Sequence, residues 1–552
     1  MSAGIIKLQN ELIEALDKAC KKLFDIDAPV NINPADPKFG DFQTNLPFIL
    51  VKKLKKAPIL IGKELADEIE EDFKGKISIE VVGGFMNFTI SPNLLSKMVR
   101  LIIESPKDFI KVDYGQAGRF SGIKDLSKKI QLEYVSANPT GPMNIVSARA
   151  AAVGDTLSKL MANCDMKVFS EYYINDAGNQ IDILGKSFLA RLKEVKGEDT
   201  EFPENGYHGD YLIDYAKEYL KENDNKIGDN YTKWILNRVI RENRKVLEDY
   251  NVIFDGWFSE KEFRNSYDIQ SLLERFGDDV YKKDGALWFK GEKYNNEIED
   301  FVLVKSDGQY SYRLIDIAYN LDKLENRGFE RAIIILGPDH HGHVARMQAA
   351  MESLGYKGKL EILILQQVNL FEGGEKVKMS KRAGKIIMMK ELVDEVGSDV
   401  ARYFFLTRKM EAHLDFDLDL AKKQGDENPV YYIQYAHARI ANVILHAKKQ
   451  GVDIDDIDYS DIVWDEDNEL EMMHKIARFP SIAINAMVGR QPHLVAFYLH
   501  ELAQLFHPFY FKYRIVSDDK EITKRRLILS KALKNVFKEV LGLLGISAPE
   551  SM

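Results

Sequence analysis

Hydrophobic and polar positions change their periodicity along the chain, and the first part alternates between helical and strand patterns. Apolar residues recur at helical spacing from Ile5 to Leu23, and a turn-rich segment follows at 31–45. The elements expected after that segment are helices at 47–56 and 59–73 and strands at 77–82 and 85–90. The pattern predicts a compact α+β domain that ends near Lys111.

Residues 113–420 alternate strand and helix patterns, which is typical of a parallel sheet covered by helices. The strand candidates are 130–135, 167–173, 301–305, 331–336 and 359–365. Between Gly197 and Asn295 the chain is charged, rich in tyrosine and helical, with helices expected at 210–222 and 231–249. We interpret this stretch as an insertion between two halves of the sheet.

From about Ala421 the strand pattern ends, and helical stretches rich in aromatic and basic residues follow. Their expected cores are 428–446, 469–486, 492–513 and 521–544. The sequence therefore predicts an α/β multidomain protein with domains at 1–112, 113–420 and 421–552, of which the last is an all-α helical bundle.

Composition narrows the class of protein. Of the 552 residues, 45% are hydrophobic and 29% are charged, as in a soluble globular protein. No apolar run reaches the roughly 18 residues that a membrane-spanning helix needs, and the start lacks a signal-peptide pattern. The two cysteines, Cys20 and Cys164, form no CxxC pair, which argues against a disulfide framework or a cysteine zinc site. We expect a cytoplasmic protein.

The net charge of −10 argues against a non-specific DNA-binding protein, because such proteins are usually basic. It leaves open a nucleic-acid partner that local basic patches hold.

The stretch from Gln131 to Met161 combines three features of a phosphate site. An apolar, strand-like run breaks at 138–142 (NPTGP), and a helix rich in small residues follows. Pro142 suits a first helical turn, where its missing N–H would have no partner. Free N–H groups and the helix dipole at such a turn favour an anion. The alternative is an ordinary strand–turn–helix unit.

Two further clusters have candidate chemistry. Residues 376–385 hold five cations after two glycines and suit a mobile loop that closes over a polyphosphate, although a solvated basic loop is the alternative. Asp339 to His343 (DHHGH) directly follows an apolar run, at the edge where open α/β sheets bind ligands. We disfavour a metal site there, because three histidines on one turn rarely converge on one ion.

Two pairs of residues are further candidates for a functional site. Tyr312 and Asp316 are four residues apart, so they share one face of a helix. Glu133 and Asn138 bracket the strand end before the candidate phosphate turn. A buried carboxylate there needs a cation partner, which a guanidinium ligand or a structural arginine would equally supply.

Blocks of sequence in the same order resemble arginyl-tRNA synthetase, a class I aminoacyl-tRNA synthetase. The blocks are KFGDFQTN (38–45), GFMNF (84–88), EYVSANPTGP (133–142), EYYINDAGNQI (171–181), DGA followed by LWF (284–289), SDG, SY and DIAY (306–319), GPDHHG (337–342), KMSK (378–381) and NPVYYIQYAHAR (428–439). The resemblance covers nearly the whole chain. It implies a Rossmann-like catalytic domain between an N-terminal tRNA-elbow domain and a C-terminal anticodon-binding domain.

The resemblance also implies a role for individual residues. Arginine would be held by Glu133, Asn138, Tyr312, Asp316 and His340. ATP would be held by Pro142, Asn144, Ser147, Gly337, Asp339, His341, Met379, Ser380 and Lys381. Catalytic roles would fall to Lys378, Lys381, Asn144 and Ser147. Transfer RNA would be contacted by Phe39, Asp41, Asn45, Asn87, Tyr432, Gln434, His437 and Arg439.

The expected substrates are L-arginine, ATP with Mg²⁺, and tRNA(Arg). We expect no tightly bound cofactor, no resident metal, no membrane partner and a monomer.

The chain departs from the family at the phosphate helix, where Asn144-Ile145-Val146-Ser147 replaces His-x-Gly-His. Asn144 and Ser147 can donate hydrogen bonds to phosphate, but neither side chain can carry a positive charge. We therefore expect an active arginine–tRNA ligase, with a catalytically impaired tRNA-binding relative as the alternative.

Overall fold

The computed structural model describes residues 3–121, 127–377, 387–458, 462, 464 and 466–552. It divides into two compact units. The first unit holds 1–128, 159–166 and 423–552, and the second holds 129–158 and 167–422.

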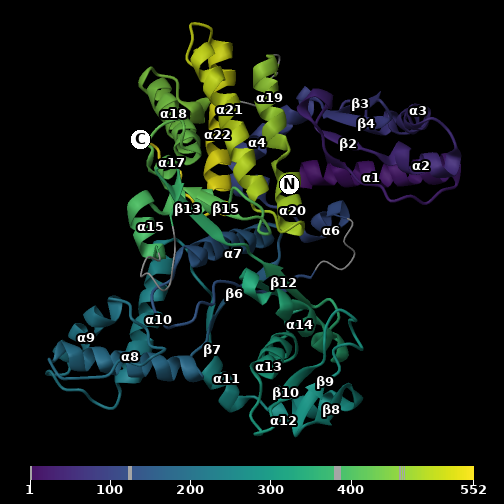
Figure 1. The fold of residues 1–552 in the computed structure, drawn as a ribbon. Helices are drawn as coiled ribbons and strands as arrows, with labels where there is room; N and C mark the ends of the chain where they lie inside the picture. The colour runs from purple at the N-terminus through teal and green to yellow at the C-terminus, as the bar shows by residue number, and fades with distance from the viewer. Residues whose placement is uncertain (1–2, 122–126, 378–386, 459–461, 463, 465) are drawn as a thin grey trace. The chain divides into compact units, whose positions relative to one another are not determined.

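The N-terminal part of the first unit is the predicted α+β arrangement (Figure 1). Its helices are α1 (Ala3–Phe24), α2 (Leu46–Leu54) and α3 (Pro58–Ile69), followed by α4 (Pro92–Glu104), α5 (Pro106–Ile110) and α6 (Tyr114–Ser121). Its antiparallel sheet has the order β1-β2-β4-β3, with β1 at Asn33–Pro34, β2 at Phe42–Thr44, β3 at Ile77–Val82 and β4 at Phe85–Ile90. β1 and β2 lie in the predicted turn-rich segment and are too short to produce a periodic pattern.

The C-terminal part of the first unit is the predicted helical bundle. Its helices are α18 (Pro429–Lys449), α19 (Asp467–Ala477), α20 (Phe479–Val488), α21 (His493–Lys512) and α22 (Lys520–Leu543). The helix expected at 469–486 is divided at Arg478, since Pro480 lies in the first turn of α20 and has no N–H for a continuous helix. α18 packs against both α21 and α22.

The second unit contains the predicted parallel sheet, in the order β12-β11-β5-β6-β7. The strands are β5 (Lys129–Glu133), β6 (Lys167–Ile174), β7 (Gly256–Ser259), β11 (Arg331–Leu336) and β12 (Leu360–Ile364), and all neighbours pair in parallel. β7 lies inside the stretch interpreted as an insertion, so part of that stretch belongs to the sheet. Four residues directly before a helix give too weak a pattern to show it.

One predicted strand of this unit belongs to another sheet. β10 (Phe301–Val304) pairs antiparallel with β9 (Ala286–Phe289), which pairs with β8 (Val280–Lys283). A short apolar run reads the same in either kind of sheet, so the sequence could not assign it. A further small sheet joins β13 (Val368–Glu372) to β14 (Glu375–Lys376) and β15 (Leu414–Asp417).

The helices of the second unit position the candidate site. They are α7 (Ile145–Asn163), α8 (Asn179–Val195), α9 (Tyr211–Glu222), α10 (Tyr231–Asp249), α11 (Glu260–Ser266), α12 (Ile269–Arg275), α13 (Tyr312–Glu325), α14 (His341–Ser353), α15 (Met389–Val396), α16 (Ser398–Phe405) and α17 (Leu418–Lys422). α13 and α14 bury apolar faces against β11 in one core. α8, α9 and α10 lie beside one another in Figure 1, and their apolar side chains form a separate cluster.

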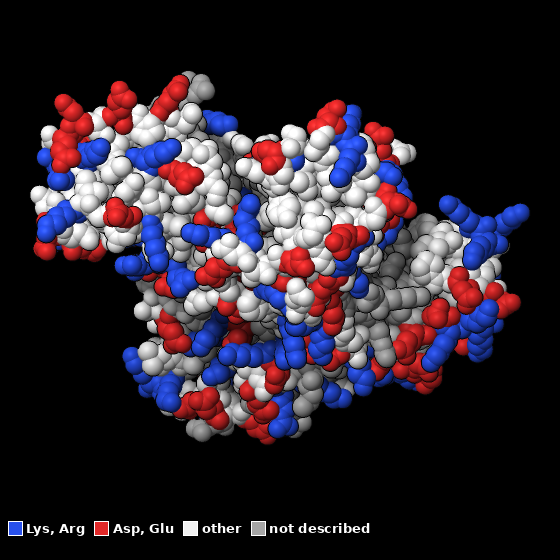
Figure 2. Space-filling view, turned by 90° about the horizontal axis from the view of Figure 1, so that it is seen from below, with Lys and Arg blue, Asp and Glu red and all other residues white. Residues whose placement is uncertain are grey.

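Charges are mixed on the surface. On the face drawn in Figure 2, Lys and Arg side chains are interspersed with Asp and Glu. Among the described residues, no helix combines the length and the apolar character needed to cross a membrane.

Candidate active site

The candidate phosphate turn begins at a strained bend after β5. Val135 and Ser136 both adopt positive φ, at 68° and 38°. For a β-branched residue this is a rare conformation, and such strain is concentrated at functional sites. The Ser136 hydroxyl accepts the Tyr173 N–H at 3.0 Å and donates to Glu133 Oε1 at 3.2 Å. The bend therefore turns the chain away from the sheet and fixes the Glu133 carboxylate.

Helix α7 begins directly after the turn, and Asn144 caps it. The Asn144 side-chain oxygen accepts the N–H groups of Val146 at 3.0 Å and Ser147 at 3.2 Å. The side chain thus accepts hydrogen bonds from two backbone N–H groups that have no partner within the helix. Its own amide N–H₂ group remains as a donor for an anion.

The small-residue face of α7 allows the predicted close approach of the strand. A Cβ atom added at Gly154 would lie 2.2 Å from Tyr134 Cγ. Tyr134, directly after β5, is 1% exposed. Its ring packs against Phe254 with the ring centroids 4.4 Å apart. Gly154 is therefore required for α7 to lie against the end of β5.

The Glu133 carboxylate has a cation partner within the protein. Lys323 of α13 donates to Glu133 Oε2 at 2.7 Å. The Lys323 side chain is 0% exposed and that of Glu133 is 8% exposed. From the sequence we expected a positive partner for this carboxylate, either a guanidinium ligand or a structural arginine. In the structure the partner is a lysine.

A second buried glutamate lies on the neighbouring strand β6. Glu171 forms a bidentate pair with Arg327, and it accepts hydrogen bonds from Tyr319 at 2.6 Å and Gln131 at 3.0 Å. Burial, together with the charges of Glu133 and Glu171, raises the pKa of Tyr319. The ring of Tyr319 also lies 4.0 Å from the ammonium of Lys323. This network gives the pocket a fixed wall.

Asp316 and Glu260 complete a cluster of carboxyl groups. Glu260, the first residue of α11, is 5% exposed and pairs with Arg264. Burial, followed by the charges of Glu260 and Glu133, raises the pKa of Asp316 to about 8. His343 Nε2 lies 3.6 Å from Asp316, but burial lowers the pKa of this histidine to about 4. At pH 7 His343 is therefore neutral, and Asp316 is mainly protonated.

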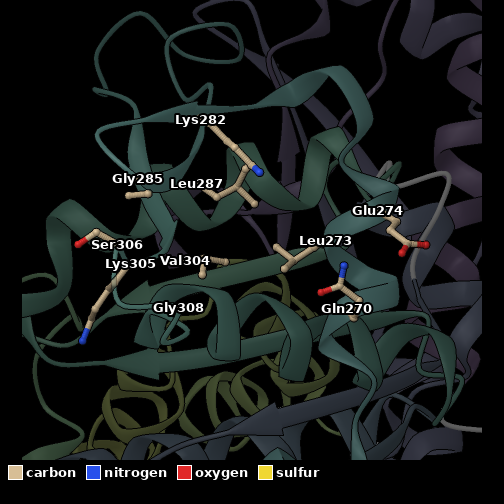
Figure 3. Close-up of a pocket in the computed structure, with 11 residues that line it drawn as sticks. Gln270, Leu273, Glu274, Lys282, Gly285, Leu287, Val304, Lys305, Ser306 and Gly308 are labelled. Atoms are coloured by element: carbon tan, nitrogen blue, oxygen red, sulfur yellow. The ribbon is translucent and has the colours of Figure 1, made fainter.

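A cavity of about 1170 Å³ opens beside the phosphate turn. It is lined by Asn138, Pro142, Asn144 and Ser147 on one side and by Tyr207, Tyr211 and Asn243 of the helical stretch on the other. A smaller cavity of about 420 Å³ lies among α12, β8, β9 and β10 (Figure 3). None of the predicted site residues that the structure describes lines the smaller cavity.

The structure brings together some of the predicted arginine-binding residues. Glu133 and Asp316 belong to the carboxyl cluster, and Tyr312 begins α13 with 59% of its surface exposed. Asn138 lines the cavity at the turn and accepts a hydrogen bond from Asn175 at 3.2 Å. His340 lies in the short helical turn after β11, 3.7 Å from Asp339.

The predicted ATP-binding residues divide into three sets. Pro142, Asn144 and Ser147 line the cavity, whereas Gly337 and Asp339 follow the carboxyl end of β11. The backbone of His341 begins α14. Lys378, Met379, Ser380 and Lys381 lie outside the described residues.

The predicted tRNA-binding residues differ in exposure. Phe39 and Asn45 are exposed, whereas Asp41 and Asn87 are 0% and 3% exposed. Asp41 accepts from the Ile90 N–H, lies 2.8 Å from His474 Nδ1 and pairs with Arg478, which ties the N-terminal part of its unit to α19 and α20.

In the helical bundle, Gln434 and His437 are buried and hold the last residues of the chain through Ser547 and Pro549. Tyr432 is half-buried beside His507. The guanidinium of Arg439 lies 4.3 Å from the ring of Tyr435 and 4.9 Å from that of Phe511, which is 76% exposed.

The chain is similar to known proteins over nearly its whole length. Three family models match the chain: "Arginyl tRNA synthetase N terminal domain" over 7–90, "tRNA synthetases class I (R), catalytic domain" over 116–403 and "DALR anticodon binding domain" over 433–552. The arginine–tRNA ligase of Desulforamulus reducens is 39% identical over 99% of this chain and 97% of its own length. The chain belongs to the arginyl-tRNA synthetase family.

Other relatives in this family extend the likeness. The arginine–tRNA ligase of Shouchella clausii is 40% identical over 94% of this chain and 93% of its own length. A solved structure of a putative arginyl-tRNA synthetase from Campylobacter jejuni has a TM-score of 0.75 and 34% identity, over 84% of this chain and 100% of its own. The Thermus thermophilus arginyl-tRNA synthetase has the same fold, with a TM-score of 0.75 at 20% identity, over 99% of this chain and 100% of its own.

Two residues of the carboxyl cluster were missed from the sequence. Glu260 is the first residue of α11 and directly follows β7, and Lys323 lies seven residues beyond Asp316 on α13. Lys323 lies at helical spacing on the same face as Tyr312 and Asp316. A lysine on that face was therefore a clue that it could pair with a carboxylate of the cluster. For Glu260 no such clue existed, because the preceding strand β7 was not recognised.

Proposed function

We propose that the protein is an arginine–tRNA ligase, which uses ATP to activate L-arginine and transfers the arginyl group to tRNA(Arg). The observation that carries this proposal is the carboxyl cluster next to the phosphate turn. Glu133 and Asp316 belong to one cluster, in which burial and the neighbouring carboxylates raise the pKa of Asp316 to about 8 while His343 stays neutral. A bound guanidinium favours the ionised form of Asp316, and its planar fork of donors fits two carboxylates better than an ammonium does.

In the activation step, the carboxylate oxygen of arginine attacks the α-phosphorus of ATP and pyrophosphate leaves. No covalent intermediate with the protein is needed, so catalysis is positioning and stabilisation of phosphate charge. The Asn144 amide and the Ser147 hydroxyl donate to the phosphates from the cavity lining. Lys378 and Lys381 supply the positive charge that these side chains lack, and Mg²⁺ enters with ATP.

In the transfer step, a hydroxyl at the 3′ end of tRNA displaces AMP from the arginyl adenylate. Exposure favours Phe39, Asn45, Tyr432 and Arg439 as the direct contacts to tRNA. Asp41, Asn87, Gln434 and His437 support those contacts from inside the fold, because their side chains are buried. Aromatic faces beside a guanidinium suit unpaired bases.

We assign one function to each of the three regions expected from the sequence. Residues 1–112 bind the tRNA elbow, 113–420 carry the catalytic site together with the stretch 197–295, and 421–552 bind the anticodon. We further propose a cytoplasmic monomer.

The test is charging of an unmodified tRNA(Arg) transcript by the purified protein with ATP and Mg²⁺. We expect charging with arginine and none with lysine or with a noncognate tRNA. Glu133→Gln should weaken arginine use strongly while tRNA binding is retained, and Lys381→Ala should slow adenylate formation in single turnover. Retained tRNA binding without any charging would instead indicate the impaired relative.

A further inference from the structure

The buried ammonium of Lys323 has no role in the proposed chemistry, yet it lies among the charged groups of the proposed arginine site. Its side chain is 0% exposed and bonds Glu133 Oε2 at 2.7 Å. It also lies 4.0 Å from the centre of the Tyr319 ring. A lysine is almost never fully buried unless it is paired, so this placement is a strong constraint on the pocket.

The charges around the pocket are matched one by one. Glu133 pairs with Lys323, Glu171 with Arg327, and Glu260 with Arg264. Among the described residues, no lysine or arginine forms an ion pair with Asp316. A further positive charge beside Asp316 would therefore be matched by ionisation of its carboxyl group, which keeps its proton while the site is empty.

We propose that Lys323 is a specificity-determining positioning residue, which reserves Glu133 Oε2 and leaves a pocket that accepts a guanidinium and rejects an ammonium. This inference rests on the proposed arginine site. With Oε2 bound to Lys323 and Oε1 held by Ser136, Glu133 is fixed in one orientation toward the pocket. The orientation lets one N–H of a guanidinium reach Oε1 while others reach Asp316.

The ammonium group of Lys323 also explains why the site would reject lysine as a substrate. The charge of a lysine substrate is compact, and it would approach a pocket whose wall already holds a compact positive charge. Arginine spreads its charge over a planar group and makes several directed hydrogen bonds. Like charges that are placed close together in a buried site disfavour the wrong ligand even when the attractive groups are unchanged.

The experiment compares Lys323→Gln with Lys323→Arg. Glutamine keeps a hydrogen-bond donor for Glu133 and removes the charge, whereas arginine keeps the charge and changes the geometry. The exposed Lys282→Gln, at the smaller cavity shown in Figure 3, is the matched control. The readout is amino-acid-dependent exchange of pyrophosphate into ATP, with tRNA(Arg) present, measured for arginine and for lysine as kcat and KM.

For Lys323→Gln we expect the ratio of kcat/KM for arginine over lysine to fall by at least about tenfold, with the arginine KM raised more than kcat is lowered. For Lys323→Arg we expect lysine to remain excluded while the arginine KM rises. An unchanged ratio in Lys323→Gln overturns the proposal. If that variant does not fold, an unchanged arginine KM in Lys323→Arg overturns it instead.

Two further variants separate this inference from the proposed function. If Glu133→Gln and Asp316→Asn leave the arginine KM unchanged, the pocket itself is wrongly assigned. If they raise that KM and the Lys323 variants behave like Lys282→Gln, the arginine site stands and only the role of Lys323 falls.

Discussion

At the scale of single residues, Asp316 is the group on which the proposed pocket depends. Its surroundings favour the protonated carboxyl in the free protein, because burial and the charges of Glu260 and Glu133 raise its pKa to about 8. A bound guanidinium favours the ionised form. Arginine binding is therefore coupled to the loss of a proton from Asp316.

This coupling predicts a pH dependence of arginine use. Below pH 8, Asp316 must lose its proton before it can pair with the guanidinium, so the KM for arginine should rise as the pH falls from about 8 toward 6. Asp316→Asn should have a high KM that varies little over this range. Steady-state charging at fixed, saturating ATP and tRNA measures both. A wild-type KM that is flat from pH 6 to 8 would contradict the coupling.

The same raised pKa predicts that Asp316 makes the folded protein less stable as the pH rises. In the unfolded chain Asp316 ionises near pH 3.8, whereas in the folded protein it keeps its proton up to about pH 8. The folded state then binds more protons than the unfolded state, so this group lowers stability progressively as the pH rises from about 4 to 8. In the absence of arginine, Asp316→Asn should raise the melting temperature at pH 8 more than at pH 4.5. Equal shifts at both values would rule out this titration.

At the scale of elements, the sequence predicted those parts of the site that one continuous segment contains. The strand, the turn and the small-faced helix from Gln131 to Met161 were recognised, because their periodicities and proline positions are local. The carboxyl cluster was predicted only in part, since Glu133, Glu260 and Lys323 come from β5, α11 and α13. Their meeting depends on the order of strands in the sheet, which no local pattern contains.

The contact between β5 and α7 gives an element-scale prediction. Gly154→Ala would place a methyl group on the Tyr134 ring, so we expect a loss of about 1–3 kcal/mol in stability. Gly542→Ala in α22 is the matched control, because open space surrounds that position. There we expect a gain of about 0.4–1 kcal/mol, since alanine restricts the unfolded chain.

Thermal melting of both glycine variants provides the measurement. The charging rate of Gly154→Ala should also fall, because a displaced α7 moves Asn144 and Ser147 at the phosphate turn. A Gly154→Ala protein that melts like the wild type would show that the strand and helix can separate without penalty.

At the scale of the whole molecule, the chain's first and last regions share one compact unit. Each region has its own periodic pattern of helices or strands, but no periodicity joins positions more than 400 residues apart. Asp41 illustrates the difference. From the sequence it reads as a turn residue or a tRNA contact, whereas in the structure it is a buried partner of Arg478 and His474.

The contact between Asp41 and Arg478 leads to the last prediction. Arg478 donates to Asp41 Oδ1 at 3.1 Å and to the Gly40 carbonyl at 2.7 Å, and its removal leaves a buried carboxylate without its main counter-charge. Arg478→Met should therefore destabilise this unit by about 3–5 kcal/mol. Arg100→Ala, which breaks an exposed pair with Glu104, should change stability by less than about 0.5 kcal/mol.

Melting temperatures measure the loss of stability in Arg478→Met, and hydrogen exchange in β4 shows where the fold is loosened. The Ile90 N–H donates to Asp41, so its exchange should speed up in Arg478→Met and stay unchanged in Arg100→Ala. The double variant Asp41→Asn with Arg478→Met should recover part of the loss, because it removes the stranded charge together with its partner. If the single and double variants are equally unstable, the loss comes from the packing of the Arg478 side chain, and the ion pair does not hold the two regions together.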